Sequence, residues 1–76
     1  MNTAETERVL RENVGRAVRV TVNSPEGHSA IWAVENVDQE GFSYTIIEDS
    51  DWERGEKCWS EYGELASVEP WDSDAN

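Results

Sequence analysis

The sequence contains little that could cross-link the chain or carry it through a membrane. Its one cysteine, Cys58, excludes an internal disulfide, and neither a zinc ribbon nor a CxxC redox motif is possible. The N-terminal residues lack the basic segment and apolar run of a signal peptide. No apolar stretch approaches the roughly 20 residues of a membrane-spanning helix. We therefore expect a cytoplasmic protein that does not enter membranes.

Basic residues are scarce, and the resulting negative charge is unevenly placed. Seventeen acids against six bases give a net charge of −11. Residues 1–37 carry a net charge of −1, whereas residues 38–76 hold twelve acids against Arg54 and Lys57, a net charge of −10. Such a field repels nucleic acid and anionic membranes and attracts basic protein surfaces. The alternative, that the acidity only keeps the protein soluble or suits it to a salty cytoplasm, stays open.

Signatures of catalysis are also missing. His28 is the only histidine, and no nucleophile–base arrangement or phosphate-binding glycine motif accompanies it. Acids alternate at residues 49, 51 and 53 as the early ligands of a calcium loop do, but Arg54 and Ser60 occupy its sixth and twelfth places, where Gly and Glu are needed. Cys58 suits core filling. We expect no enzyme, no cofactor and no metal site.

What the chain does contain fits one domain, residues 1–76, that begins with a helix. Helical spacing of apolar residues predicts a helix over residues 4–13, with Thr3 as its N-cap. Gly15 fits the left-handed position that ends a helix. The helix is expected to place three apolar side chains on the core: Val9, Leu10 and Val14.

Alternating apolar residues predict five short strands after the helix. Turn residues separate them, and Gly41 is expected to adopt a positive φ in the second turn. A polar loop spans residues 49–56, Pro70 interrupts the last strand, and an acidic tail at 72–76 is expected to fray. The strands are predicted over residues 16–22, 29–37, 42–48, 57–59 and 65–69, with a helical turn over 60–63 before the last.

Aromatic residues supply large units of buried area, so most of the four Trp, two Tyr and one Phe should be structural. Trp32 and Trp59 are expected in the core, and Trp71 is expected to close the barrel end or the helix. The strand faces predict a buried set: Val18, Val20, Trp32, Val34, Tyr44, Ile46 and Leu65.

This order of elements resembles the SH3-like and Sm-like small β-barrels. The resemblance covers about residues 4–70 and rests on Gly15-Arg-Ala-Val-Arg-Val, Asp38-Gln-Glu-Gly-Phe and the segment from Trp59 to Glu69, where a helical turn precedes the last strand. It implies a mainly β fold, a barrel over residues 16–70 behind one helix. Sm-like proteins are expected to offer basic RNA-contacting loops, and this chain offers acids there.

Acidic residues around the fourth strand form the predicted partner-binding surface. In size and acidity the chain is similar to phage-encoded inhibitors of host defence, including anti-CRISPR and anti-restriction proteins that mimic nucleic acid. This favours a non-catalytic inhibitor or adaptor that docks on a basic, nucleic-acid-binding surface of another protein. The alternatives are an SH3-like accessory domain that binds a peptide through aromatics, and a small-ligand binder or minor enzyme with a cleft near His28, Tyr44 and Trp59. The predicted partner-binding residues are Glu48, Asp49, Asp51, Trp52, Glu53, Glu56, Glu61 and Glu64.

Overall fold

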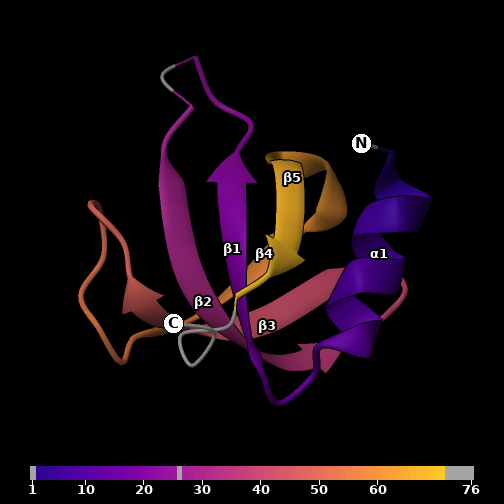
Figure 1. The fold of residues 1–76 in the computed structure, drawn as a ribbon, viewed down its shortest axis with the longest axis horizontal. Helices are drawn as coiled ribbons and strands as arrows, with labels where there is room; N and C mark the ends of the chain where they lie inside the picture. The colour runs from indigo at the N-terminus through magenta and orange to yellow at the C-terminus, as the bar shows by residue number, and fades with distance from the viewer. Residues whose placement is uncertain (1, 26, 72–76) are drawn as a thin grey trace.

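The computed structural model describes residues 2–25 and 27–71 and is mainly β (Figure 1). One helix, α1 (Thr3–Glu12), precedes five antiparallel strands in one sheet with the order β4-β3-β2-β1-β5. The predicted fold class is confirmed; the tail at 72–76 lies outside the described residues. The strands are β1 (Ala17–Val22), β2 (Ser29–Val37), β3 (Gly41–Glu48), β4 (Lys57–Glu61) and β5 (Leu65–Pro70), with a 3-10 turn, η1 (Tyr62–Glu64), before β5.

Helix α1 begins one residue earlier than predicted because its cap is Asn2, not Thr3. The Asn2 side chain accepts a hydrogen bond from the Glu5 amide at 2.9 Å, which satisfies one of the free donors of the first turn. Gly15 has the predicted positive φ, +82°, but the helix has already ended: its C-cap is Asn13, and the Gly15 amide donates to the Val34 carbonyl at 2.8 Å. The chain has already turned there, so Val14 is 48% exposed and does not reach the core as expected.

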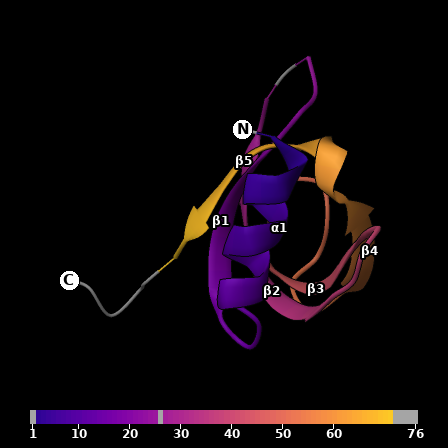
Figure 2. The ribbon, with the colours of Figure 1, turned by 90° about the vertical axis from the view of Figure 1, so that its right-hand side faces the viewer.

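The sheet curls because its longest strand is irregular. Strand β2 pairs with both β1 and β3, and its register with β3 shifts between Ile31 and Trp32 and again between Val34 and Asn36. Such bulges bend a strand and increase its twist. The bent sheet wraps into a small barrel, and α1 lies across one end of it (Figure 2).

The core fills the inside of this curved sheet and continues under α1. All seven residues predicted to be buried are buried. Leu10 joins them from the helix, and Phe42 packs between Tyr44 and Tyr62 with ring centroids 5.2 and 6.2 Å away. The full buried apolar set is Leu10, Val18, Val20, Ala30, Trp32, Val34, Phe42, Tyr44, Ile46, Tyr62, Leu65 and Val68.

The predicted end of the sheet was wrong in detail. Strand β4 continues to Glu61, since Ser60 and Glu61 pair with Phe42 and Gly41, and the helical turn follows only at Tyr62. Trp59 was expected in the core, but its side chain points to the face opposite Ser60 and is 49% exposed. Pro70 does not interrupt β5: it stands at the end of an edge strand, where a missing amide donor is tolerated.

Gly41 does not adopt the predicted positive φ. Its position requires glycine for a different reason. A Cβ here would press against the Ser60 carbonyl and lie 2.6 Å from the Trp59 ring, so the constraint is close packing of β3 on β4. The preceding turn is held by Asp38, whose carboxylate accepts hydrogen bonds from the Glu40 and Gly41 amides at 2.8 and 2.9 Å. These donors hold the pKa of Asp38 below its ordinary value, the Gly41 amide most strongly.

Candidate binding site

A pocket of about 280 Å³ lies between the barrel strands and the β3–β4 loop, residues 49–56. In Figure 1 that loop extends on the side of the molecule opposite α1. Aromatic side chains contribute much of the pocket wall: Trp32, Tyr44, Trp52 and Trp59. We call it the aromatic pocket. It lies where the sequence allowed a cleft near His28, Tyr44 and Trp59, and all three residues line it.

Two of the four aromatics are rigid parts of the core. Trp32 and Tyr44 face each other across the β2–β3 pair, stacked with centroids 3.9 Å apart and planes 10° apart. Both are buried. Stacked, buried rings have little freedom to move, so this part of the pocket wall is preformed.

The other two aromatics are exposed. Trp52, from the β3–β4 loop, is 54% exposed, and Trp59, on β4, is 49% exposed. Trp52 is one of the predicted partner-binding residues, and it lines the pocket while still facing solvent. Large aromatic side chains left in water beside a pocket are typical of interface anchors.

Asp49 connects the pocket to the core. Its carboxylate accepts a hydrogen bond from the Trp32 indole N–H at 3.0 Å and from the Asp51 amide at 2.9 Å. Its side chain is 1% exposed. The sequence-based expectation that Asp49 points outward as part of a display is therefore wrong: the Trp32 indole, which needs an acceptor once buried, holds it inward.

A second carboxylate reaches the pocket from η1. Glu64 accepts a hydrogen bond from the Ser60 hydroxyl through Oε2 at 2.6 Å. Its Oε1 has no hydrogen-bond donor among the described residues. The two acids also act on Tyr44, whose pKa is raised mainly by burial and further by Cys58 and the charges of Asp49 and Glu64.

His28 faces Asp49 and Asp51. Its Nε2 lies 3.5 Å from Asp49 Oδ1 and 3.8 Å from Asp51 Oδ2. Within the described part of the chain, these three residues form a set that could hold a metal ion, with ligand atoms within 4.8 Å of one another. The two carboxylate oxygens of Asp49 already accept hydrogen bonds, so the arrangement is also complete as a hydrogen-bonded cluster. Of the three acids with calcium-like spacing, Asp49 and Asp51 lie beside His28, and Glu53 does not belong to this set.

The loop that carries the remaining predicted residues is tied to β3. The Ile46 amide donates to the Glu56 carbonyl at 2.9 Å, and the Gly55 amide donates to the Ile46 carbonyl at 2.8 Å. Gly55 has φ of +93°, which favours glycine. Asp51, Glu53 and Glu56 are exposed on this anchored loop. Of the eight predicted residues, the aromatic pocket brings together Asp49, Trp52 and Glu64.

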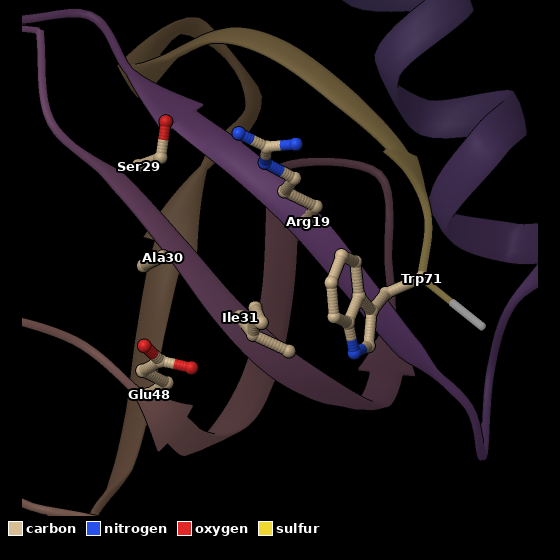
Figure 3. A pocket seen from close by; sticks show the side chains of 6 residues that line it. All are labelled: Arg19, Ser29, Ala30, Ile31, Glu48 and Trp71. Atoms are coloured by element: carbon tan, nitrogen blue, oxygen red, sulfur yellow. The ribbon is translucent and has the colours of Figure 1, made fainter. Parts of the chain in front are cut away.

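Glu48 belongs to a different surface, which the sequence did not distinguish. Consecutive side chains of a strand point to opposite faces of the sheet, so the side chains of Glu48 and Asp49 diverge at the end of β3. Glu48 lines a shallow hollow of about 330 Å³ together with Arg19, Ile31 and Trp71 (Figure 3). We call it the Trp71 hollow. Glu61 is exposed on β4 opposite Gly41 and lines neither the pocket nor the hollow.

Trp71 does not close the barrel in the way expected. Its amide donates to the Ala17 carbonyl at 3.1 Å, which extends the β1–β5 edge, and its side chain is 39% exposed beside Arg19. Among the lining residues that sequence reasoning did not place at a site are Ser60, Cys58 and Leu65. The inward direction of Ser60 depends on the extension of β4 past Trp59, which the sequence pattern did not show.

In comparisons with known proteins, no family model, no curated protein and no solved structure matches the chain.

Within the described residues, no helix combines the length and the apolar character that a membrane crossing requires.

Proposed function

We propose that the protein is a non-catalytic binding protein whose β3–β4 loop and aromatic pocket dock on a basic surface of a partner protein. The observation that supports this most is the meeting of exposed Trp52 and Trp59 with the carboxylates of the acidic half. Exposed aromatics surrounded by charge give an interface both an apolar anchor and a polar rim.

Electrostatic complementarity selects the partner class. The acidic loop carries Asp51, Glu53 and Glu56 toward solvent, and its exposed bases are Arg54 and the adjacent Lys57. Many basic protein surfaces bind phosphates, so a protein of this charge can compete with DNA or RNA for them. The likeness to phage-encoded inhibitors of host defence is one of size and charge, and inhibition of a nucleic-acid-binding complex stays a prediction.

The proposed fold relationship is with SH3-like and Sm-like barrels. The strand order β4-β3-β2-β1-β5 behind one helix, and the 3-10 turn before β5, support it. The second candidate function, an accessory domain that binds a peptide mainly through aromatics, is favoured by the same Trp52 and Trp59. Salt separates the two, because charge-driven binding weakens steeply with ionic strength and aromatic docking much less.

The test compares two triple charge reversals of equal size. One changes the loop, with Asp51→Lys, Glu53→Lys and Glu56→Lys; the other changes distant exposed acids, with Glu5→Lys, Glu12→Lys and Glu40→Lys. Binding of a fluorescent decalysine peptide is measured by anisotropy in low salt and in 0.5 M NaCl. The loop reversal should weaken binding at least tenfold more than the distant reversal. Equal losses would mean that the acidity is a diffuse solubility property, and the docking proposal would fail.

A further inference from the structure

The aromatic pocket is negatively charged inside as well as aromatic. Asp49 and Glu64 line it, and neither arginine nor lysine does so among the described residues. The neighbouring ionisable group is His28, which carries a positive charge only when protonated. A group that enters this pocket therefore meets aromatic residues and two carboxylates, an environment that favours a cation when His28 is neutral.

The size of the pocket limits what can enter. Its volume of about 280 Å³ is at the lower end of the roughly 300–1,000 Å³ typical of small-molecule sites. A single side chain from a partner protein fits that volume better than a large cofactor does. Because the acidic loop beside the pocket favours a basic partner, that side chain is expected to be an arginine or a lysine.

The chemistry of the wall distinguishes the two. A guanidinium is planar, stacks on indole faces and forms paired hydrogen bonds to carboxylates, whereas an ammonium is a compact, strongly hydrated point charge. The exposed indole of Trp52 offers a stacking face, and Glu64 offers Oε1 as a free acceptor among the described residues. The charge of Asp49 lies behind them, held by Trp32. The Trp59 ring lies against Gly41 and takes no part in this contact.

We propose that the aromatic pocket is an arginine-binding site, which receives one arginine side chain of the partner protein against Trp52 with its guanidinium toward Glu64. This inference rests on the proposed docking function and adds the residue that the pocket selects. The acidic loop attracts the basic partner over a distance, and the pocket then holds its arginine by stacking and a charge-assisted hydrogen bond.

The test uses two peptides of equal length and charge, (Arg-Gly)5 and (Lys-Gly)5, titrated into the full chain by calorimetry. EDTA is present so that no divalent metal occupies the His28 cluster. The arginine peptide should bind about tenfold more tightly, the factor that one desolvated cation–aromatic contact can supply. Equal affinities for the two peptides, or tighter binding of a trimethyllysine peptide than of the arginine peptide, would overturn the arginine assignment.

Variants locate the preference. Trp52→Ala and Glu64→Gln should each reduce the arginine preference several-fold, and Gln can still accept the Ser60 hydrogen bond. Trp71→Ala, the matched control in the other hollow, should retain it. Survival of the full preference in the Trp52→Ala variant would contradict the site. The triple loop reversal should weaken the binding of both peptides equally. The docking proposal can therefore hold even if the arginine assignment is wrong.

Discussion

The two ends of the barrel treat their aromatic residues in opposite ways. At the end covered by α1, Tyr62 is buried, and its hydroxyl donates to the Asp38 carbonyl. At the other end, Trp52 remains exposed beside the pocket that Asp49 and Glu64 line. A helix covers one end of this short domain and a large aromatic side chain stays in water at the other, which supports the proposal that the open end is the binding surface.

The two hollows give a second contrast. The Trp71 hollow contains both Arg19 and Glu48, so its charges oppose each other (Figure 3). Arg19 also lies 3.9 Å from Glu69 on β5. The aromatic pocket has two carboxylates and neither arginine nor lysine among its lining residues, and its basic residue is His28, 3.5 Å from Asp49. An exposed tryptophan alone therefore does not distinguish the two hollows; the difference in basic residues does, and it supports the proposed site.

The largest expected effect is on stability at the helix-covered end. Leu10 is fully buried there, so Leu10→Ala should lower the free energy of unfolding by about 2–5 kcal/mol through lost burial and a cavity. In a domain of this size each kcal/mol shifts Tm by roughly 4–8 °C. Thermal melting by circular dichroism measures it. An unchanged Tm would mean that α1 does not pack on the core as described.

A smaller loss is expected where the two ends are joined through β3 and β4. Gly41→Ala places a methyl group against the Ser60 carbonyl and the Trp59 ring, and overpacking of this kind costs roughly 1–3 kcal/mol. Gly63→Ala is the control, since a Cβ there meets nothing within 4 Å. Urea denaturation of both variants separates them. Equal stability of the two would show that β4 does not lie this close to Gly41.

At the open end, truncation should affect binding and leave stability nearly unchanged. Trp52→Ala is expected to change the free energy of unfolding by about 1 kcal/mol or less, because more than half of the side chain is already in water and the residue lies on the β3–β4 loop. The same urea experiment measures it. A loss above 2 kcal/mol would assign Trp52 to the core and remove the contrast between the two ends.

The smallest expected effect concerns the acid dependence of the Asp38 turn. The pKa of Asp38 is lowered by the Gly41 and Glu40 amides, so its carboxylate contributes stability above its ordinary pKa and loses it as the pH falls below about 4. The Tm difference between the native chain and Asp38→Asn should therefore shrink as the pH falls from 5 to 2. A difference that grows toward low pH would reverse the sign of this contribution.

The sequence predicted the fold better than the site, for a physical reason. Period-2 alternation identifies the inward residues of β1, β2 and β3 because one face of each strand is buried. The same rule failed at Trp59, because the register of β4 depends on its pairing with β3 and not on a local pattern. Likewise, composition located the acids in the second half, but the pairing of Trp32 with Asp49 decides which of them points inward.

The central claim is that the open, acidic end and not the Trp71 hollow binds a cation. The indole N–H resonances of the four tryptophans report on it directly in a ¹⁵N-labelled sample titrated with N-acetyl-arginine amide. The account predicts a shift at Trp52, with Trp71 unchanged because Arg19 beside it repels the ligand. A shift at Trp71 with none at Trp52 would contradict it.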